Sequence, residues 1–180
     1  MESNFTQTEI EDLKQVTDFF IKSVCGKSDF ENCYKNVNHD SLMMQGTGIW
    51  KKINFEEQKN IYEQISKTTF DKIWMYCEST YYPSETKSKD ICAVALGKYQ
   101  NYLAELGKTN PRIAKYAERI QASGAFNGFD IQYQEILKSD SNFDLNDPNI
   151  KLILAIHYLS LNDEVNRNAH LRQRQEPTFK

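Results

Sequence analysis

Glycine and proline are scarce in this chain, with 7 and 4 residues among 180. Five of these residues stand where helical patterns begin or end: Gly26, Gly107 and Gly124 follow apolar helical stretches, and Pro111 and Pro148 follow Asn or Asp. Glycine after the last helical residue and proline at the first helical position are typical of helix boundaries. Alternation of apolar and polar residues over a full strand length is lacking. We therefore expect an all-α fold.

Long apolar runs are also lacking, because the most apolar stretch, 150–161, is interrupted by Lys151, His157 and Ser160. A membrane-spanning helix needs about 20 apolar residues, so no membrane insertion is expected. The amino terminus has neither the basic start nor the apolar core of a signal peptide. A mature chain would lack one in any case, so localisation stays open on this evidence.

A large excess of one charge is missing too, because 22 Lys and Arg stand against 25 Asp and Glu, for a net charge of −3. Nucleic-acid-binding domains normally carry a basic patch, so no nucleic-acid partner is expected. With 39% hydrophobic and 12% aromatic residues, the chain is well supplied for a folded core. We expect a single domain over residues 1–180, with 175–180 as a loose tail.

Apolar residues at helical spacing predict about seven helices. The clearest starts are a capping-box pair, either Thr6 with Glu9 or Thr8 with Glu11, the N-cap Asn54, and Asn110 and Asp147 before proline. Short helix–loop–helix spacing also allows a solenoid-like stacking of helical hairpins.

The middle of the chain is predicted as helix, loop and helix. Phe70, Ile73 and Trp74 stand at helical spacing and predict a helix over 70–78. A loop follows over 79–89, and apolar residues from Ile91 onwards predict the next helix, which extends to Leu106.

Four cysteines form two pairs close in sequence, Cys25 with Cys33 and Cys77 with Cys92. As disulfides they would each contribute about 3 kcal/mol by closing short loops, and the protein would be periplasmic or exported. As reduced thiols they would be small buried side chains of a cytoplasmic protein. The sequence leaves both alternatives open. A zinc site is not expected, because no CxxC occurs.

Recognisable catalytic and metal-binding motifs are lacking. The chain has no GxSxG, HExxH, P-loop or calcium-loop pattern, so no catalytic residue, metal ion or cofactor is expected. His39 and Asp40, with Glu78, are the candidates for an enzyme site built from dispersed residues. A turn in which Asp40 caps the next segment is the simpler explanation of the first two.

Aromatic residues in the predicted loops are the remaining candidates for function. Trp50 follows a glycine-rich turn, and Tyr81, Tyr82 and Glu85 lie in the loop between two paired cysteines. Tyrosine and tryptophan are frequent binding anchors, because they bury a large area at a low entropy cost. Alternatively, these rings close over the ends of the helical bundle. A disulfide around the tyrosine loop would make it rigid and favour recognition.

The expected function is therefore binding of another protein without catalysis. A small, acidic, helical domain with stapled loops fits a bacterial toxin-neutralising (immunity-type) protein that blocks a cognate effector. The alternatives are the dispersed enzyme site around His39 and Asp40 and a helical scaffold or regulatory adaptor. Oligomeric state is not predicted.

Overall fold

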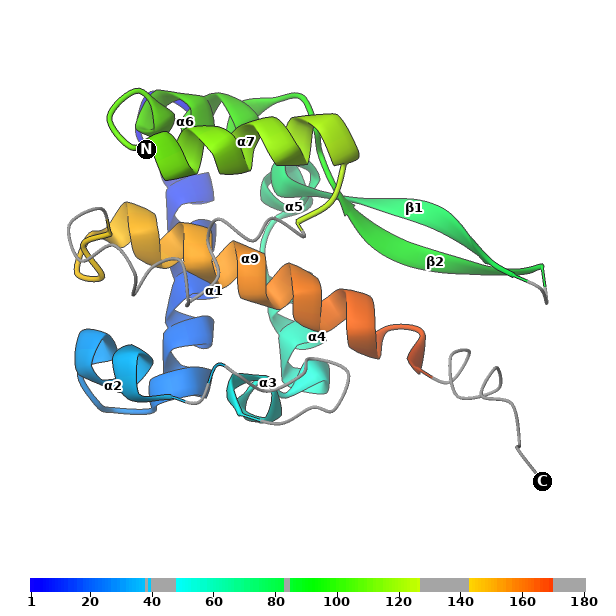
Figure 1. Cartoon of the computed structure of the whole chain (residues 1–180), viewed down its shortest axis with the longest axis horizontal. Coiled ribbons are helices and arrows are strands. Elements are labelled where there is room, and N and C mark those ends of the chain that lie inside the picture. The colour runs from blue at the N-terminus through cyan, green and yellow to red at the C-terminus, as the bar shows by residue number, and fades with distance from the viewer. Residues whose placement is uncertain (38, 40–47, 83–84, 127–142, 170–180) are drawn as a thin grey trace.

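The computed structural model describes residues 1–37, 39, 48–82, 85–126 and 143–169. These ranges contain eight helices and one two-stranded antiparallel sheet. The helices are α1 (Gln7–Cys25), α2 (Phe30–Asn36), α3 (Ile49–Lys52), α4 (Phe55–Gln64), α5 (Lys67–Ile73), α6 (Lys98–Gly107), α7 (Pro111–Ser123) and α9 (Pro148–Asn166). Strands β1 (Trp74–Tyr81) and β2 (Thr86–Ala93) form a hairpin that projects from the helical body (Figure 1).

The hairpin shows that the all-α prediction is wrong, because the fold is mixed, although mostly helical. The helix predicted over 70–78 ends at Ile73, and the chain continues as β1. Ile91 and Cys92, assigned to a helix from their spacing, lie in β2. β1 is rich in tyrosine, tryptophan and threonine, which favour extended backbone. The helices do not form a superhelical stack either: several of them pack around one central helix (Figure 1).

The predicted helix starts are confirmed, because each has a cap formed by nearby residues. At α1, the N–H of Glu9 donates to the Thr6 hydroxyl at 3.4 Å, and the N–H of Thr6 donates to the Glu9 carboxylate at 2.9 Å. The side chains of Asn54, Asn110 and Asp147 accept bonds from the first free amides of α4, α7 and α9. Such caps each stabilise a helix by about 1 kcal/mol.

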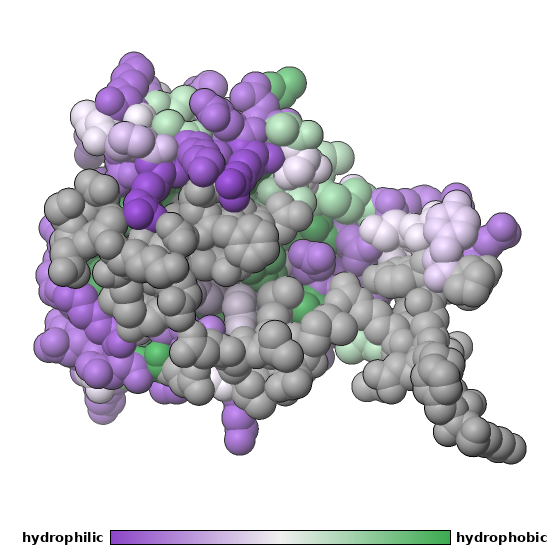
Figure 2. Space-filling view, in the orientation of Figure 1, coloured by the Kyte–Doolittle hydropathy of each residue, from purple (hydrophilic) through white to green (hydrophobic). Residues whose placement is uncertain are grey.

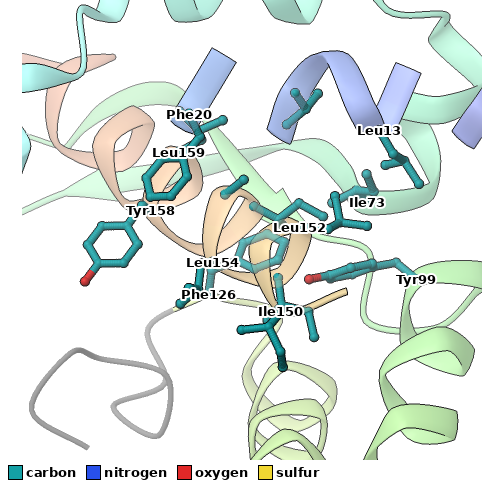
Figure 3. Close-up of a cluster of buried hydrophobic side chains, with 14 of the residues drawn as sticks. Leu13, Phe20, Ile73, Tyr99, Phe126, Ile150, Leu152, Leu154, Tyr158 and Leu159 are labelled. Atoms are coloured by element: carbon teal, nitrogen blue, oxygen red, sulfur yellow. The ribbon is translucent and has the colours of Figure 1, made fainter. Parts of the chain in front are cut away.

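α9 is the centre of the core. Every residue from Leu152 to Asp163 is buried, so this part of the helix has no face in solvent. α1 crosses it, and α4 and β2 also pack on it (Figure 1). Figure 3 shows its side chains among Leu13 and Phe20 of α1 and Ile73 of α5. Burial of each large apolar side chain stabilises the fold by about 1.5–3 kcal/mol.

Polar side chains of α9 bond to neighbouring elements inside this core. The indole N–H of Trp74 donates to the Ser160 hydroxyl at 2.8 Å, and that hydroxyl donates to the Ile156 carbonyl at 2.6 Å. The Asn162 amide donates to Gln58 Oε1 of α4 at 2.8 Å. A buried polar group without a partner would be costly, so these bonds fix how α9 sits against α4 and the root of the hairpin.

Candidate functional site

The root of the hairpin belongs to the helical body, whereas its outer part projects from it (Figure 1). The strands pair Trp74 with Ala93 at the root and Tyr81 with Thr86 at the outer end. Trp74 is fully buried, and the N–H of Ala93 donates to the carbonyl of Gly124 at 2.8 Å. Further out, the side-chain amide of Asn168 donates to the Lys89 carbonyl at 3.2 Å and to the Asp90 carboxylate at 2.5 Å, so one more contact ties β2 to the helical body.

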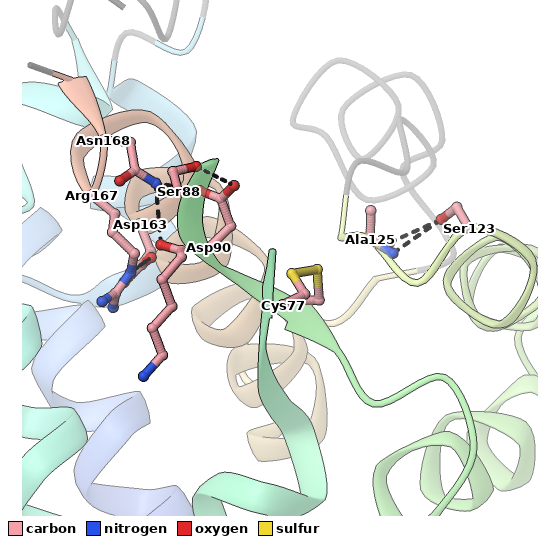
Figure 4. Close-up of a disulfide and its surroundings, with 10 residues drawn as sticks. Cys77, Ser88, Asp90, Ser123, Ala125, Asp163, Arg167 and Asn168 are labelled. Carbon is pink, nitrogen blue, oxygen red and sulfur yellow. Dashed lines mark hydrogen bonds and ion pairs between the residues drawn. A yellow bond between two sulfur atoms is a disulfide. The ribbon is translucent and has the colours of Figure 1, made fainter. Parts of the chain in front are cut away.

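A disulfide joins the two strands of the hairpin between Cys77 and Cys92, with Cα atoms 6.0 Å apart (Figure 4). It runs diagonally, because Cys77 stands opposite Asp90 and Cys92 opposite Met75. An isolated two-stranded hairpin is marginally stable in water. The cross-link therefore keeps the projecting strands in one register.

The second disulfide joins Cys25 at the end of α1 to Cys33 in α2, with Cα atoms 5.7 Å apart. All four cysteines are thus paired, as the first of the two sequence alternatives predicts. Two disulfides in a chain of this size are typical of a protein from an oxidising, exported location.

Exposed aromatic and apolar side chains occur along the hairpin. Tyr82, just beyond β1, is 75% exposed, and Met75 and Tyr76 near the root are each about half exposed. Glu85 is exposed, with a φ of 53° at the turn into β2. The side chain of Tyr81 lies outside the described residues. Figure 2 shows apolar surface at the root of the hairpin and mostly hydrophilic surface towards its outer end.

A cleft of about 400 Å³ opens between α4, α5 and the root of the hairpin. Its aromatic lining consists of Tyr62, Phe70 and Tyr76. The ring of Phe70 lies 5.6 Å from that of Tyr62 and 5.7 Å from that of Tyr76. Burial raises the pKa of the Tyr62 hydroxyl well above its usual value, so this group stays neutral. The cleft therefore offers aromatic surface continuous with β1.

Two cations lie over the exposed Tyr76 ring. Lys89 Nζ is 3.9 Å and the Arg167 guanidinium carbon 5.4 Å from the ring centroid, within the range of cation–π attraction. Arg167 is held by two bonds to the buried Asp163, at 2.6 and 2.7 Å (Figure 4). Burial raises the pKa of Asp163, and its hydrogen bonds to Arg167 oppose that shift. The hydrogen bonding to Asp163 raises the pKa of Arg167, so its charge persists.

Trp50, a predicted binding residue, lies on α3, away from the hairpin (Figure 1). Its ring is half-buried and packs 5.1 Å from that of Tyr158 in α9. The structure therefore does not bring Trp50 together with Tyr82 and Glu85.

The residues of the dispersed enzyme site are not brought together either. His39 packs between α2 and α9, with Nε2 2.6 Å from the carbonyl oxygen of Tyr34 and Nδ1 3.3 Å from the hydroxyl of Tyr158. Glu78 lies on the hairpin, where it pairs with Lys87 at 3.2 Å. Asp40 lies outside the described residues.

Within the described ranges, no group of His, Cys, Asp and Glu side chains is arranged to hold a metal ion. No helix of that part of the chain combines the length and apolar character needed to cross a membrane. Comparison with models of known protein families, with curated proteins and with solved structures gives no match for this chain. The case for a function therefore depends on the geometry of the hairpin and the cleft.

Proposed function

We propose that this is a binding protein of an oxidising compartment that recognises another protein through its hairpin. The observation that carries the proposal is the cross-link between Cys77 and Cys92 within a projecting hairpin that exposes Tyr76 and Tyr82. Large exposed aromatic side chains in a fixed position are what a protein-binding surface needs at its centre.

The cross-link lowers the entropic cost of binding. A flexible loop must become ordered when it binds, and this ordering reduces affinity. The hairpin is already ordered, because the disulfide and the strand ladder fix its backbone before a partner arrives. Most of the available contact energy is therefore expected to appear as affinity.

The specific form that we propose is the toxin-neutralising (immunity-type) function expected from the sequence. In this form the partner is a bacterial effector, and the hairpin enters and blocks its active site. A narrow projecting element suits a concave target, as long loops of small antibody domains do. The small net charge of −3 is compatible with a basic partner.

The proposal is tested by photo-crosslinking in the native host. A benzoylphenylalanine in place of Tyr82 should give one discrete adduct, which mass spectrometry identifies. The same residue in place of Lys14, exposed on α1, is the matched control and should not give that adduct. Equal adducts from both positions, or none from position 82, would overturn the proposal.

The identified partner is then purified and its affinity measured. Tyr82→Ala should weaken the complex at least tenfold. Lys14→Ala should leave the affinity unchanged. An unaltered affinity for Tyr82→Ala would show that the hairpin end is not the binding element.

A further inference from the structure

The backbone of β2 shows which groups of the hairpin point outwards. The N–H of Ala93 bonds to Gly124 at 2.8 Å, and the carbonyl of Lys89 accepts from the Asn168 amide at 3.2 Å. These groups therefore point away from β1. Because alternate residues of a strand share an edge, Lys87 also faces the outer edge of β2.

The same alternation applies to β1. In an antiparallel pair, residues opposite one another point their backbone groups in matching ways, either both towards the partner strand or both away from it. Tyr76, Glu78 and Thr80 stand opposite Ile91, Lys89 and Lys87. Their N–H and C=O groups consequently face away from β2. Over these five residues, about 13 Å of chain, β1 offers three donors and three acceptors in one row.

The two edges of the hairpin differ in how they are covered. α9 packs on β2, and Asn168 beyond it bonds to both the Lys89 carbonyl and the Asp90 carboxylate (Figure 4). At Tyr76, Glu78 and Thr80, no backbone partner is found in the described part of the chain. Figure 1 shows no helix beside the outer half of β1.

An open strand edge is a liability that proteins usually protect with lysine, proline or a bulge. The outward residues of β1 are Tyr76, Glu78 and Thr80, and the one charge among them is paired with Lys87. Within the described residues no lysine, proline or bulge of β1 protects this edge, and the disulfide keeps the strand in register. Both properties suit a surface that is covered in a complex.

We propose that an extended segment of the partner protein pairs with the outer edge of β1 and places an apolar side chain in the cleft beside Tyr76. This inference rests on the proposed function and deepens it, because it names the kind of partner segment. Strand addition takes its affinity from backbone hydrogen bonds and its specificity from pockets for alternate side chains. The cleft supplies such a pocket, since Tyr76 belongs to both β1 and its lining.

The charges around the cleft indicate the rest of the segment. Three cations at the cleft are already paired with carboxylates: Lys59 with Glu56, Lys67 with Asp71 and Arg167 with Asp163. Lys89, which lies over the Tyr76 ring, has no ion-pair partner among the described residues. Charge complementarity selects partners. The segment is therefore expected to carry a carboxylate next to its apolar residue, where it can pair with Lys89.

Two proline substitutions separate edge pairing from all other uses of the hairpin. Glu78→Pro removes one outward N–H from β1, and Lys87→Pro removes one from β2. Proline is tolerated on an edge strand where the N–H faces solvent. Both variants lose the same ion pair between Glu78 and Lys87, so they form a matched pair that differs only in the edge affected.

The probe is a displayed library of random twelve-residue peptides, selected on the oxidised full-length protein. We expect enriched peptides with apolar residues at alternate positions and a carboxylate beside one of them. Glu78→Pro should lower the affinity for these peptides at least tenfold, and Lys87→Pro should lower it less than threefold. Hydrogen exchange on the unmodified protein gives a second readout that does not require the variant to fold. A bound peptide should slow exchange of the Tyr76 and Glu78 amides.

Several results would overturn the inference. One is a selection that enriches no peptide. Others are equal losses of peptide affinity in the two proline variants, or unchanged amide exchange at Tyr76 and Glu78 when peptide is bound. If Tyr82→Ala weakens binding of the peptides and Glu78→Pro does not, the hairpin is still the binding element, but the peptides do not pair with the edge of β1. A dimer that Glu78→Pro dissociates would assign the edge to a second copy of the chain. Failure of the crosslink at position 82 remains a separate result, which bears on the proposed function itself.

Discussion

Acidification is expected to destabilise the protein through His157, which lies fully buried in α9. Its Nδ1 atom is 3.2 Å from the hydroxyl of Tyr116 in α7. Burial lowers the pKa of His157 from 6.5 to about 4, and the main chain at Phe126 opposes this shift only in part. The folded protein therefore keeps the imidazole neutral at a pH where the unfolded chain already binds a proton.

The sign and size of the effect follow from these two values. Because the pKa of His157 is lower in the folded state, its contribution is fully present above pH 6.5 and is lost as the pH falls towards 4. A difference of about 2.5 in pKa corresponds to about 3.4 kcal/mol in total. At pH 5 the loss is about 2 kcal/mol. That is a large share of a typical stability of about 5–15 kcal/mol.

The assay is urea unfolding from pH 8 to pH 5, followed by fluorescence, with the buried Trp74 as a reporter. His157→Gln is the matched variant, since it removes the titrating group and leaves other ionisable groups in place. The difference in unfolding free energy between the two proteins should shrink by about 2 kcal/mol between pH 8 and pH 5. A difference constant within about 0.5 kcal/mol would refute the reasoning.

Three further predictions concern the hairpin and one buried carboxylate. Replacing Cys77 and Cys92 by serine should lower the free energy of unfolding by up to about 3 kcal/mol and speed amide exchange in the hairpin more than in α9. An equal change of amide exchange in the hairpin and in α9 would contradict this prediction. Asp12→Asn should cost about 1–3 kcal/mol in unfolding free energy at pH 7, because one Asp12 oxygen accepts bonds from Ser66 and Thr69. Burial opposes ionisation of Asp12, but these bonds outweigh it and lower its pKa. The difference in unfolding free energy between the unmodified protein and Asp12→Asn should therefore narrow below about pH 4. An equal loss of stability at pH 7 and pH 2 would contradict this prediction. Tyr82→Ala should change thermal stability by less than about 0.5 kcal/mol, and a larger loss would place the ring in the core.

The helix starts were predictable because the residues that make each cap are neighbours in sequence. Thr6 and Glu9 are three residues apart, and Asn110 precedes its own proline. The hairpin was not predictable in this way. Phe70 and Ile73 at helical spacing belong to α5, and Trp74, the next residue, is already in β1. Beyond the root, the buried positions of β2 are the polar residues Ser88 and Asp90, and most of β1 is exposed, so no alternation of apolar and polar residues marks the strands.

The candidate site was predictable only where it depends on one segment. Proximity in sequence indicated which cysteines could pair and placed Tyr82 among the binding candidates, but it left open whether the cysteines are oxidised and whether the ring is exposed. The cleft does not, because Tyr62, Phe70, Tyr76 and Arg167 come from different parts of the chain. Only the packing of α4, α5 and the hairpin beside α9 brings them together, and no local spacing encodes that packing.

The central position of α9 has a consequence for how the molecule is made. A ribosome completes α1 and the hairpin long before it reaches Asp163, so the apolar faces that pack on α9 stay uncovered until α9 itself has been made. The contacts between α1 and α9 span most of the chain, and such long-range contacts form slowly. The two disulfides close short loops, with separations of 8 and 15 residues, and both can form first. The core is therefore expected to close only when α9 docks, and both cross-links can form before that step once the chain is in an oxidising compartment.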